Sequence, residues 1–354
     1  MLSKVIYPTH LYFLLILSTG FMVHVLFHPI ILTSSKRDSW VSVICSFVPL
    51  MIWAIMIFRL NKKLENKNIF TLINSLHPFI SNFIKILLSL YFIFTAYITC
   101  KYTGYWAKTN YTFQVPDIMM LVPFIALCYY ASLKGIKTIS AISIFLLPLV
   151  IVFGIVVGMG NMKVKDYSML LPIFENGYKE LFIGIMYSCA SFFEIIYLLF
   201  FTPFLKNRIR IKTFLPVTVL IFWLSLGPLV AAIAMFGAEE ASKMKVPAYE
   251  QWKVLTLGNN ITRLDFLSIF QWFSGAFIRV SISMFIVSQL FSHKKNIWIL
   301  SLIYILLTIG VILPWNFESF FSFIYNIFFP VSLIFFIFTF FLLFLLSKKK
   351  GDIS

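Results

Sequence analysis

Long apolar runs separated by short, basic loops dominate the chain. The hydrocarbon core of a bilayer is about 30 Å thick, so a run of about 20 apolar residues crosses it as a helix, whose backbone groups bond to one another in the absence of water. The pattern predicts ten such helices, at about residues 10–32, 40–59, 83–103, 117–133, 138–158, 181–203, 213–237, 264–290, 296–313 and 320–346. A less hydrophobic run at 68–83, NIFTLINSLHPFISNF, is interrupted by Pro78 and predicts a segment along the membrane surface.

The composition agrees with a chain that lies mostly in lipid. Hydrophobic residues make up 60% of it and charged residues 12%, with a mean hydropathy of +0.94, whereas about a quarter of a soluble domain is charged. The longest loops, at about 159–180 and 238–262, are too short to fold alone. We therefore expect an all-α polytopic membrane protein that forms a single integral membrane domain over residues 1–354.

The basic residues predict the orientation of the chain. With the N-terminus inside, seventeen of the 29 Lys and Arg residues fall on the cytoplasmic side, eleven fall outside, and Arg279 lies within a run. Only two acids, Glu65 and Asp352, fall inside. This asymmetry predicts that both termini are cytoplasmic. The net charge of +16 is spread over short loops, which does not favour nucleic acid as a partner. The tail at 347–354, SKKKGDIS, is typical of a lipid-surface anchor or a stop-transfer flank.

The residues that bind metals or form catalytic sites are not clustered. The four cysteines lie singly in or beside apolar runs, at positions 45, 100, 128 and 189, so we expect neither a disulfide framework nor a redox motif. His24 and His28 stand four residues apart, but no motif supplies further metal ligands, so a polar helix face is the favoured interpretation. We expect no cofactor and no enzyme, because no nucleophile–base motif or phosphate loop is present.

Ten helices suggest two five-helix halves of opposite orientation. In such inverted repeats the first helix of each half is broken near the midplane, and the break binds substrate or ions. The first run contains Ser18, Thr19 and Gly20, and the sixth contains small residues at corresponding positions, which include Ser188 and Ser191. We expect these clusters to bind a ligand, although small residues also let neighbouring helices approach closely.

Glu194 lies inside the sixth run, between apolar residues on both sides. Intramembrane acids are costly and usually functional, so this carboxylate is a candidate to bind a cation, an amino group or a proton. The alternative is a protonated acid that is hydrogen-bonded to a neighbouring helix. Tyr97, in the third run, is a weaker candidate for the wall of the same cavity, since tyrosine is equally common as a packing residue.

Four segments resemble the B subunits of bacterial spore germinant receptors, which are permease-like members of the amino acid–polyamine–organocation superfamily. The most specific is ITRLDFLSIFQWFSGAFIRVS at 261–281. The others are YPTHLYFLLILSTGF at 7–21, SFFEIIYLLF at 191–200 and PAYEQWKVL at 247–255, so the resemblance covers essentially the whole chain. The chain departs from the glycine-richer break expected in the first run, because Phe21, Met22, Val23 and His24 follow Gly20.

The resemblance implies a nutrient-sensing subunit in the spore inner membrane. Such a subunit would bind a small nutrient, of the amino acid or nucleoside class, and act with A-type and lipoprotein C-type subunits to trigger germination. Two other functions stay open for a chain of this kind. One is a secondary amino acid transporter coupled to H⁺ or Na⁺, and the other is a ligand-gated conduit for ions or water.

The eighth run combines charges with a long apolar stretch. Arg263 and Asp265 lie at its predicted outer mouth, where they can pair with each other or hold the preceding segment 250–262 as a lid. Trp272 follows about two turns further in, as a candidate ligand contact, and Arg279 lies about four turns from Asp265. Arg279 either extends towards the cytoplasmic surface or pairs with an acid on another helix. Glu194 is the acid found within a run, but the sequence gives no distance between the two.

Overall fold

The computed structural model describes residues 4–64, 67–175, 177–256, 261–291 and 297–348. Over these ranges the protein is helical, and its β-structure is limited to one parallel bridge between Ile6 and Leu205. Lys206 N–H donates to the carbonyl of Ile6 at 2.8 Å beside this bridge. The part of the tail predicted to anchor at the lipid surface, residues 349–354, lies outside the described residues, as do Glu65 and the basic loop residues Lys294 and Lys295.

The first half of the chain begins with a helix of changing pitch. This helix consists of α1 (Pro8–Phe21), the π-helical segment η1 (Met22–Leu26) and α2 (Phe27–Ser35). The elements that follow it are the 3₁₀ turn η2 (Lys36–Asp38), α3 (Ser39–Cys45), α4 (Phe47–Leu64), α5 (Ile69–Asn74), α6 (Pro78–Asn110), α7 (Asp117–Lys134) and α8 (Ile136–Gly160). Two short 3₁₀ turns, η3 (Met162–Val164) and η4 (Tyr167–Leu170), lead into the second half.

The second half also begins with a helix of changing pitch. This helix consists of α9 (Tyr178–Phe192), the 3₁₀ segment η5 (Phe193–Tyr197), α10 (Leu198–Phe201) and the 3₁₀ turn η6 (Thr202–Phe204). The remaining elements are α11 (Ile211–Lys243), α12 (Pro247–Val254), η7 (Leu264–Phe266), α13 (Leu267–Phe291), α14 (Ile297–Ile312), α15 (Phe317–Phe323), the π-helical segment η8 (Ile324–Phe328) and α16 (Phe329–Lys348).

Eight helical stretches within the described residues are long and apolar enough to cross a membrane. One of them, Pro8–Leu64, is 57 residues long and covers the first two predicted runs, while α14, in the ninth predicted run, has only 16 residues. The chain is therefore an all-helical membrane protein, and the count of ten crossings stays a prediction.

Helix α6 contains the third predicted run and begins five residues before it. It starts at Pro78 and runs for 33 residues to Asn110. The physical reason is that a proline at the first helical position loses no hydrogen bond, and its fixed φ suits a helix start. Only the short α5 remains of the predicted surface segment, and its apolar residues Ile69, Phe70 and Ile73 are buried.

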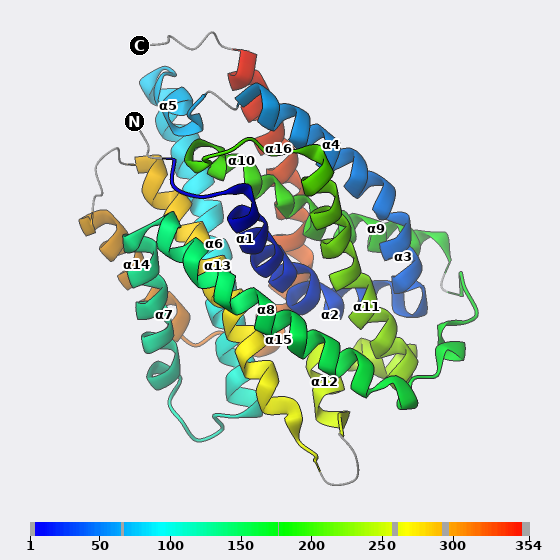
Figure 1. The fold of residues 1–354 in the computed structure, drawn as a ribbon. Helices are drawn as coiled ribbons and strands as arrows, with labels where there is room; N and C mark the ends of the chain where they lie inside the picture. The colour runs from blue at the N-terminus through cyan, green and yellow to red at the C-terminus, as the bar shows by residue number, and fades with distance from the viewer. Residues whose placement is uncertain (1–3, 65–66, 176, 257–260, 292–296, 349–354) are drawn as a thin grey trace.

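Helix α13 lies at the centre of the protein. It packs against α6, α1, α8 and α7, and Figure 1 shows it, in yellow, alongside α6 and behind α8. Of its most apolar stretch, 78% is buried, against 11% for α8, which faces outward. A helix that is buried on all sides and carries charges must find partners for them inside the protein.

The helices predicted to be broken change their pitch instead of unwinding. Met22–Leu26 is π-helical and Phe193–Tyr197 is 3₁₀-helical, and the residues that flank both segments keep right-handed helical φ and ψ angles. Such departures from regular α-helix often lie at functional positions. The two predicted clusters of small residues therefore lie directly before these pitch changes, on α1 and α9.

Proline in α11 explains the position of the two histidines. Pro228 has no N–H group, so the carbonyl of Leu224, four residues before it, loses its usual donor, and the ring of His24 bonds to this carbonyl. His28 Nε2 lies 2.9 Å from the next carbonyl, that of Ser225, and the ring of His24 contacts the ring of His28 edge-on at 5.4 Å. Within the described ranges no three metal-ligating side chains come together, and all four cysteines are free.

The close approach of α9 to the helices before it provides a test of this packing. A Cβ added at Gly184 would lie 2.7 Å from Ser42 Cβ, whereas one added at Gly227 of α11 meets nothing within 4 Å. We expect Gly184→Ala to destabilise the protein by about 1–3 kcal/mol, because overpacking forces a backbone shift. Gly227→Ala, the matched control, should be neutral or slightly stabilising. Melting temperatures in detergent compare the two, and equal melting temperatures would contradict the packing.

Candidate functional site

A buried ion pair joins three helices at the centre of the protein. Arg279 Nη1 on α13 contacts Glu194 Oε1 on η5, and both side chains are fully buried. The same Nη1 donates to the carbonyl of Ser18 on α1 at 3.3 Å, and Nη2 lies 3.5 Å from the sulfur of Met22. Ser18 Oγ donates weakly to Glu194 Oε1 at 3.5 Å. For Arg279, the sequence left open a pair with an acid on another helix or an extension to the cytoplasmic surface. The structure contains the pair, with Glu194.

The backbone is shaped to bring these groups together. Gly275 lies one turn before Arg279, and a Cβ there would lie 3.1 Å from the ring of Phe21 and 3.4 Å from the carbonyl of Leu17. Its lack of a side chain lets α13 approach α1 closely enough for the guanidinium to reach the Ser18 carbonyl. That carbonyl lies at the end of α1, where Met22 N–H is shared between the carbonyls of Ser18 and Thr19.

Several buried polar atoms around the ion pair have no well-aligned hydrogen-bond partner among the described residues, although Thr19 lies within reach of Glu194 and Thr95 lies within reach of Tyr197. They are Glu194 Oε2, Arg279 Nε, Thr19 Oγ1, Thr95 Oγ1 and the hydroxyl of Tyr197. Each such atom costs about 1–3 kcal/mol when it is left without a partner, and native proteins leave few of them. A cluster of five at one charged position is suited to a small polar molecule that would complete these bonds.

The predicted ligand residues of α1 and α9 differ in what they can offer. The hydroxyl of Thr19 lies beside the Glu194 carboxylate without a well-aligned bond to it, and a Cβ added at Gly20 would meet nothing within 4 Å, so this position borders open space. Ser188 and Ser191 are buried near Glu194, yet each hydroxyl donates to a carbonyl of its own helix, at 2.8 and 2.9 Å. Serines commonly bond back to their own helix in this way.

Tyr97 and Trp272 are not brought to the ion pair. The ring of Tyr97 packs against Phe94 and Trp315, on another part of α6. Trp272 lies further towards the predicted outer side, where its ring stacks on Trp106 at 4.1 Å and its Nε1 donates to Thr103 Oγ1 at 3.0 Å. Trp272 therefore belongs to an aromatic layer between the pair and the outer loops.

This aromatic layer separates the ion pair from the outer end. The ring of Phe21, at the end of α1, meets the edge of Trp272 at 5.7 Å, and the ring of Tyr102 stacks on Trp272 from α6. Trp106, stacked on Trp272, meets Tyr249 of α12 edge-on at 5.5 Å. Since Trp106, Trp272 and Tyr249 are at most 5% exposed, the structure is closed on this side.

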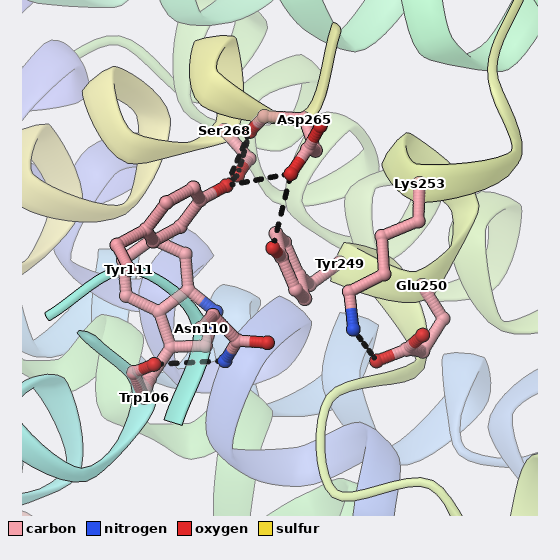
Figure 2. A network of polar contacts seen from close by, with 8 residues as sticks. All are labelled: Trp106, Asn110, Tyr111, Tyr249, Glu250, Lys253, Asp265 and Ser268. Atoms are coloured by element: carbon pink, nitrogen blue, oxygen red, sulfur yellow. Dashed lines mark hydrogen bonds and ion pairs between the residues drawn. The ribbon is translucent and has the colours of Figure 1, made fainter. Parts of the chain in front are cut away.

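A polar network ties α12 to the start of α13, above the aromatic layer (Figure 2). Tyr249 donates to Asp265 Oδ2 at 3.3 Å, and Tyr111, at the end of α6, donates to the Asp265 carbonyl at 2.8 Å. Burial raises the pKa of Tyr249 and of Tyr111, so both hydroxyls keep the protons that they donate. Arg263 Nε lies 3.1 Å from Asp265 Oδ1. Residues 257–260 of the predicted lid lie outside the described residues.

Sequence reasoning missed Tyr111, Tyr249 and Trp106, which form much of this outer closure. Tyr249 stands in the PAYEQWKVL segment, so its position near the site had a signal in the sequence. Nothing in the sequence distinguishes Trp106 or Tyr111 from the many other aromatic residues, which make up 19% of the chain. Only their stacking and hydrogen bonds assign them to the closure.

Comparisons with known proteins agree on one family. The family described as spore germination protein matches residues 7–318. The chain is 33% identical over 327 residues to spore germination protein XB of Bacillus anthracis, which covers 90% of this chain and 91% of that protein. It is 25% identical over 280 residues to the putative spore germination protein YfkT of Bacillus subtilis, over 75% and 74% of the two chains. It is also 23% identical to spore germination protein B2 of Bacillus subtilis over about half of each chain.

The buried ion pair leads to a prediction about stability. Removing one partner leaves an uncompensated buried charge, which costs about 3–5 kcal/mol. We therefore expect Arg279→Leu, which strands the Glu194 carboxylate, to lower the melting temperature of the purified protein strongly. The double variant Glu194→Gln with Arg279→Leu should recover much of this loss, since no charge remains buried. Additive losses in the double variant would show that the two residues are not coupled.

The outer network leads to a second prediction. The side chain of Asp265 is 5% exposed, and its Oδ2 accepts from Tyr249 at 3.3 Å and from Tyr111 at 3.4 Å, whereas Arg263 is 78% exposed. Exposed ion pairs contribute little, but stranded buried donors are costly. We expect Asp265→Ala to lower the melting temperature clearly and Arg263→Ala to leave it near wild type. If both substitutions had the same effect, the Arg263–Asp265 ion pair rather than the tyrosine bonds would hold the network.

Proposed function

Because the chain belongs to the spore germination protein family, we propose that it is the nutrient-sensing, permease-like subunit of a spore germinant receptor. The nutrient is a small molecule of the amino acid or nucleoside class, and its binding in the membrane triggers germination. In this proposal the chain resides in the spore inner membrane and acts with an A-type and a lipoprotein C-type subunit. The match over nearly the whole chain supports the assignment.

The observation that carries the proposal is the ion pair of Glu194 and Arg279 with its unpartnered polar neighbours. A polar nutrient bound there meets Glu194 Oε2, Arg279 Nε and the Thr19 hydroxyl, which lack well-aligned hydrogen-bond partners in the closed structure. Binding at this point changes contacts of α1, η5 and α13 together. A ligand shifts a conformational equilibrium when it binds one state better than the other, and a junction of three helices is suited to such a difference.

The charge of Arg279 favours a receptor over a coupled transporter. Arginine stays protonated at all physiological pH values, so Glu194 has a permanent counter-charge within the protein. A transporter coupled to H⁺ or Na⁺ needs an acid that binds and releases the coupling ion during each cycle. An acid paired with a fixed guanidinium is poorly suited to this exchange, and an occluding aromatic layer is poorly suited to an open conduit.

The proposal includes the topology expected from the sequence. We propose ten crossings as two inverted halves, in one integral domain, with both termini cytoplasmic. Figure 1 supports this topology. The C-terminal end of α16 and the short α10 lie at one end of the bundle, and α12 lies at the opposite end. External labelling of a cysteine introduced at Ser347, near the end of α16, would contradict this orientation.

A charge-removing substitution tests the nutrient site. Glu194→Gln keeps the shape of the side chain but leaves Arg279 without its counter-charge, so responses are compared at equal amounts of folded protein. Glu239→Gln on α11, where the acid is 87% exposed, is the control. A charge-assisted hydrogen bond contributes about 1.5–3 kcal/mol, so the Glu194 variant should need roughly 10- to 100-fold more nutrient. The measurements are nutrient-triggered germination of spores and nutrient binding to the purified protein.

The outcomes separate the competing functions. Wild-type sensitivity of the Glu194→Gln variant, at normal protein levels, would show that this carboxylate is not part of the nutrient site. Sustained accumulation of the nutrient by the reconstituted chain alone would favour a secondary transporter. An unchanged response in the Glu239→Gln control is required for either conclusion.

A further inference from the structure

Two neighbouring helices, α4 and α16, carry matching rows of side chains beside their contact (Figure 1). The contact includes the rings of Trp53 on α4 and Phe340 on α16, whose centroids are 5.2 Å apart. In each row the members are four, three and four residues apart, a spacing that keeps them on one face of the helix. The rows are Ile52, Met56, Arg59 and Lys63 on α4, and Ile337, Phe341, Phe344 and Lys348 on α16. Their apolar parts are open to the surroundings, since Ile52 and Phe341 are 55% and 56% exposed.

Both rows change from apolar to basic at the same end of the bundle. Lys63 and Lys348 meet at one ring, with their Nζ atoms 4.9 and 4.8 Å from the centroid of Phe344. Each row rises about 16 Å along its helix, from Ile52 to Lys63 and from Ile337 to Lys348. This length is about half of the hydrocarbon core of a bilayer, which is the depth of one leaflet.

The basic ends of the rows carry an excess of positive charge. Arg59, Lys63 and Lys348 form no ion pair within the part of the chain that the structure describes. In the sequence, segment 59–67 contains four basic residues and one acid, and segment 347–354 contains three basic residues and one acid. Two ammonium groups at one ring repel each other. An anionic group between them would remove this repulsion and accept charge-assisted hydrogen bonds.

The order of apolar and basic side chains indicates which occupant fits this surface. A soluble anion or an acidic peptide would use the basic end but leave the apolar rows uncovered. A membrane-spanning helix would cover the apolar rows, but its own cytoplasmic flank is typically basic and would add like charge. An anionic phospholipid has both parts in the required order, with a phosphate at the membrane surface and acyl chains that point inward.

We propose that α4 and α16 together form a binding site for one anionic phospholipid. Arg59, Lys63 and Lys348 hold its phosphate, and the apolar parts of the two rows contact its acyl chains. The site goes beyond the proposed receptor function and does not depend on it, because its residues are separate from the ion pair and from the aromatic layer.

The position of this site gives the lipid a structural role. Trp53 of α4 donates to the carbonyl of Phe193 at 3.1 Å and stacks on the Phe193 ring at 4.3 Å, directly before Glu194 in the chain. Both α4 and α16 pack against η5. A lipid that joins the basic ends of α4 and α16 therefore stabilises the two helices that hold the segment with Glu194.

Lipid binding to the purified full chain tests the site. The protein in detergent is mixed with phosphatidylglycerol or with phosphatidylcholine of the same acyl chains, and retained lipid is counted by native mass spectrometry. We expect phosphatidylglycerol to bind roughly tenfold more tightly. The double variant Lys63→Gln with Lys348→Gln should weaken phosphatidylglycerol binding roughly 10- to 30-fold, the loss expected when two basic groups are removed from a lipid surface.

Two further double variants serve as controls. Lys134→Gln with Lys137→Gln removes two charges from the same predicted side of the membrane, and Lys134 Nζ likewise lies over a ring, 5.3 Å from the centroid of Tyr130. This variant should bind phosphatidylglycerol as the wild type does. Lys63→Arg with Lys348→Arg keeps both charges and should also bind normally. Equal melting temperatures in phosphatidylcholine show that the variants are folded.

Three results would overturn the proposal. Equal binding of the two lipids would show that the rows do not select an anionic headgroup. An equal loss in the Lys134 and Lys137 variant would show that the positive charge of the whole surface, and not this site, attracts the lipid. Displacement of phosphatidylglycerol by inorganic phosphate would assign the basic end to a free anion.

Discussion

The contact between Glu194 and Arg279 is the constraint on which the rest of the structure depends. Neither charge is exposed, and both lie within helices that cross a membrane. A lone arginine in such a helix costs at least about 2.5–3.5 kcal/mol, and a buried charge that loses its partner costs about 3–5 kcal/mol. This cost holds three elements in one arrangement. They are α13 and η5, which carry the two charges, and α1, which supplies the Ser18 carbonyl.

The irregular parts of the helices follow from this constraint. The α1 carbonyl that meets the guanidinium lies where α-helix changes to π-helix, and Glu194 itself lies in a 3₁₀ segment. Gly275 allows α13 to come within reach of α1. The two pitch changes, at η1 and η5, lie at one level of the bundle, which is where the polar atoms without well-aligned partners gather. The cost of irregular backbone is thus concentrated at the position best suited to bind a ligand.

The sequence predicted the elements better than the site. Apolar runs predicted α13 at 264–290 against the observed Leu267–Phe291, because burial and hydrophobicity vary together along a helix. Helix α6 begins before the third predicted run, at Pro78, because a proline can begin a helix as well as end one. Glu194 and Arg279 stood out singly as intramembrane charges, but their contact depends on how α13 and η5 pack. Ser188 and Ser191 looked available, and only the coordinates show their bonds to their own helix.

Helix α9, which leads into Glu194, also contacts the π-helical segment η8. Tyr187 of α9 lies two turns before Glu194, and its hydroxyl donates to the carbonyl of Tyr325 at 3.3 Å, in the π-helical segment that carries Asn326. The widened π-helix leaves such carbonyls accessible to a neighbouring helix. This bond joins the helix that leads into Glu194 to the segment η8. In a receptor, a route of this kind is required, because nutrient binding inside one subunit has physical consequences for another only through shared, rigid contacts.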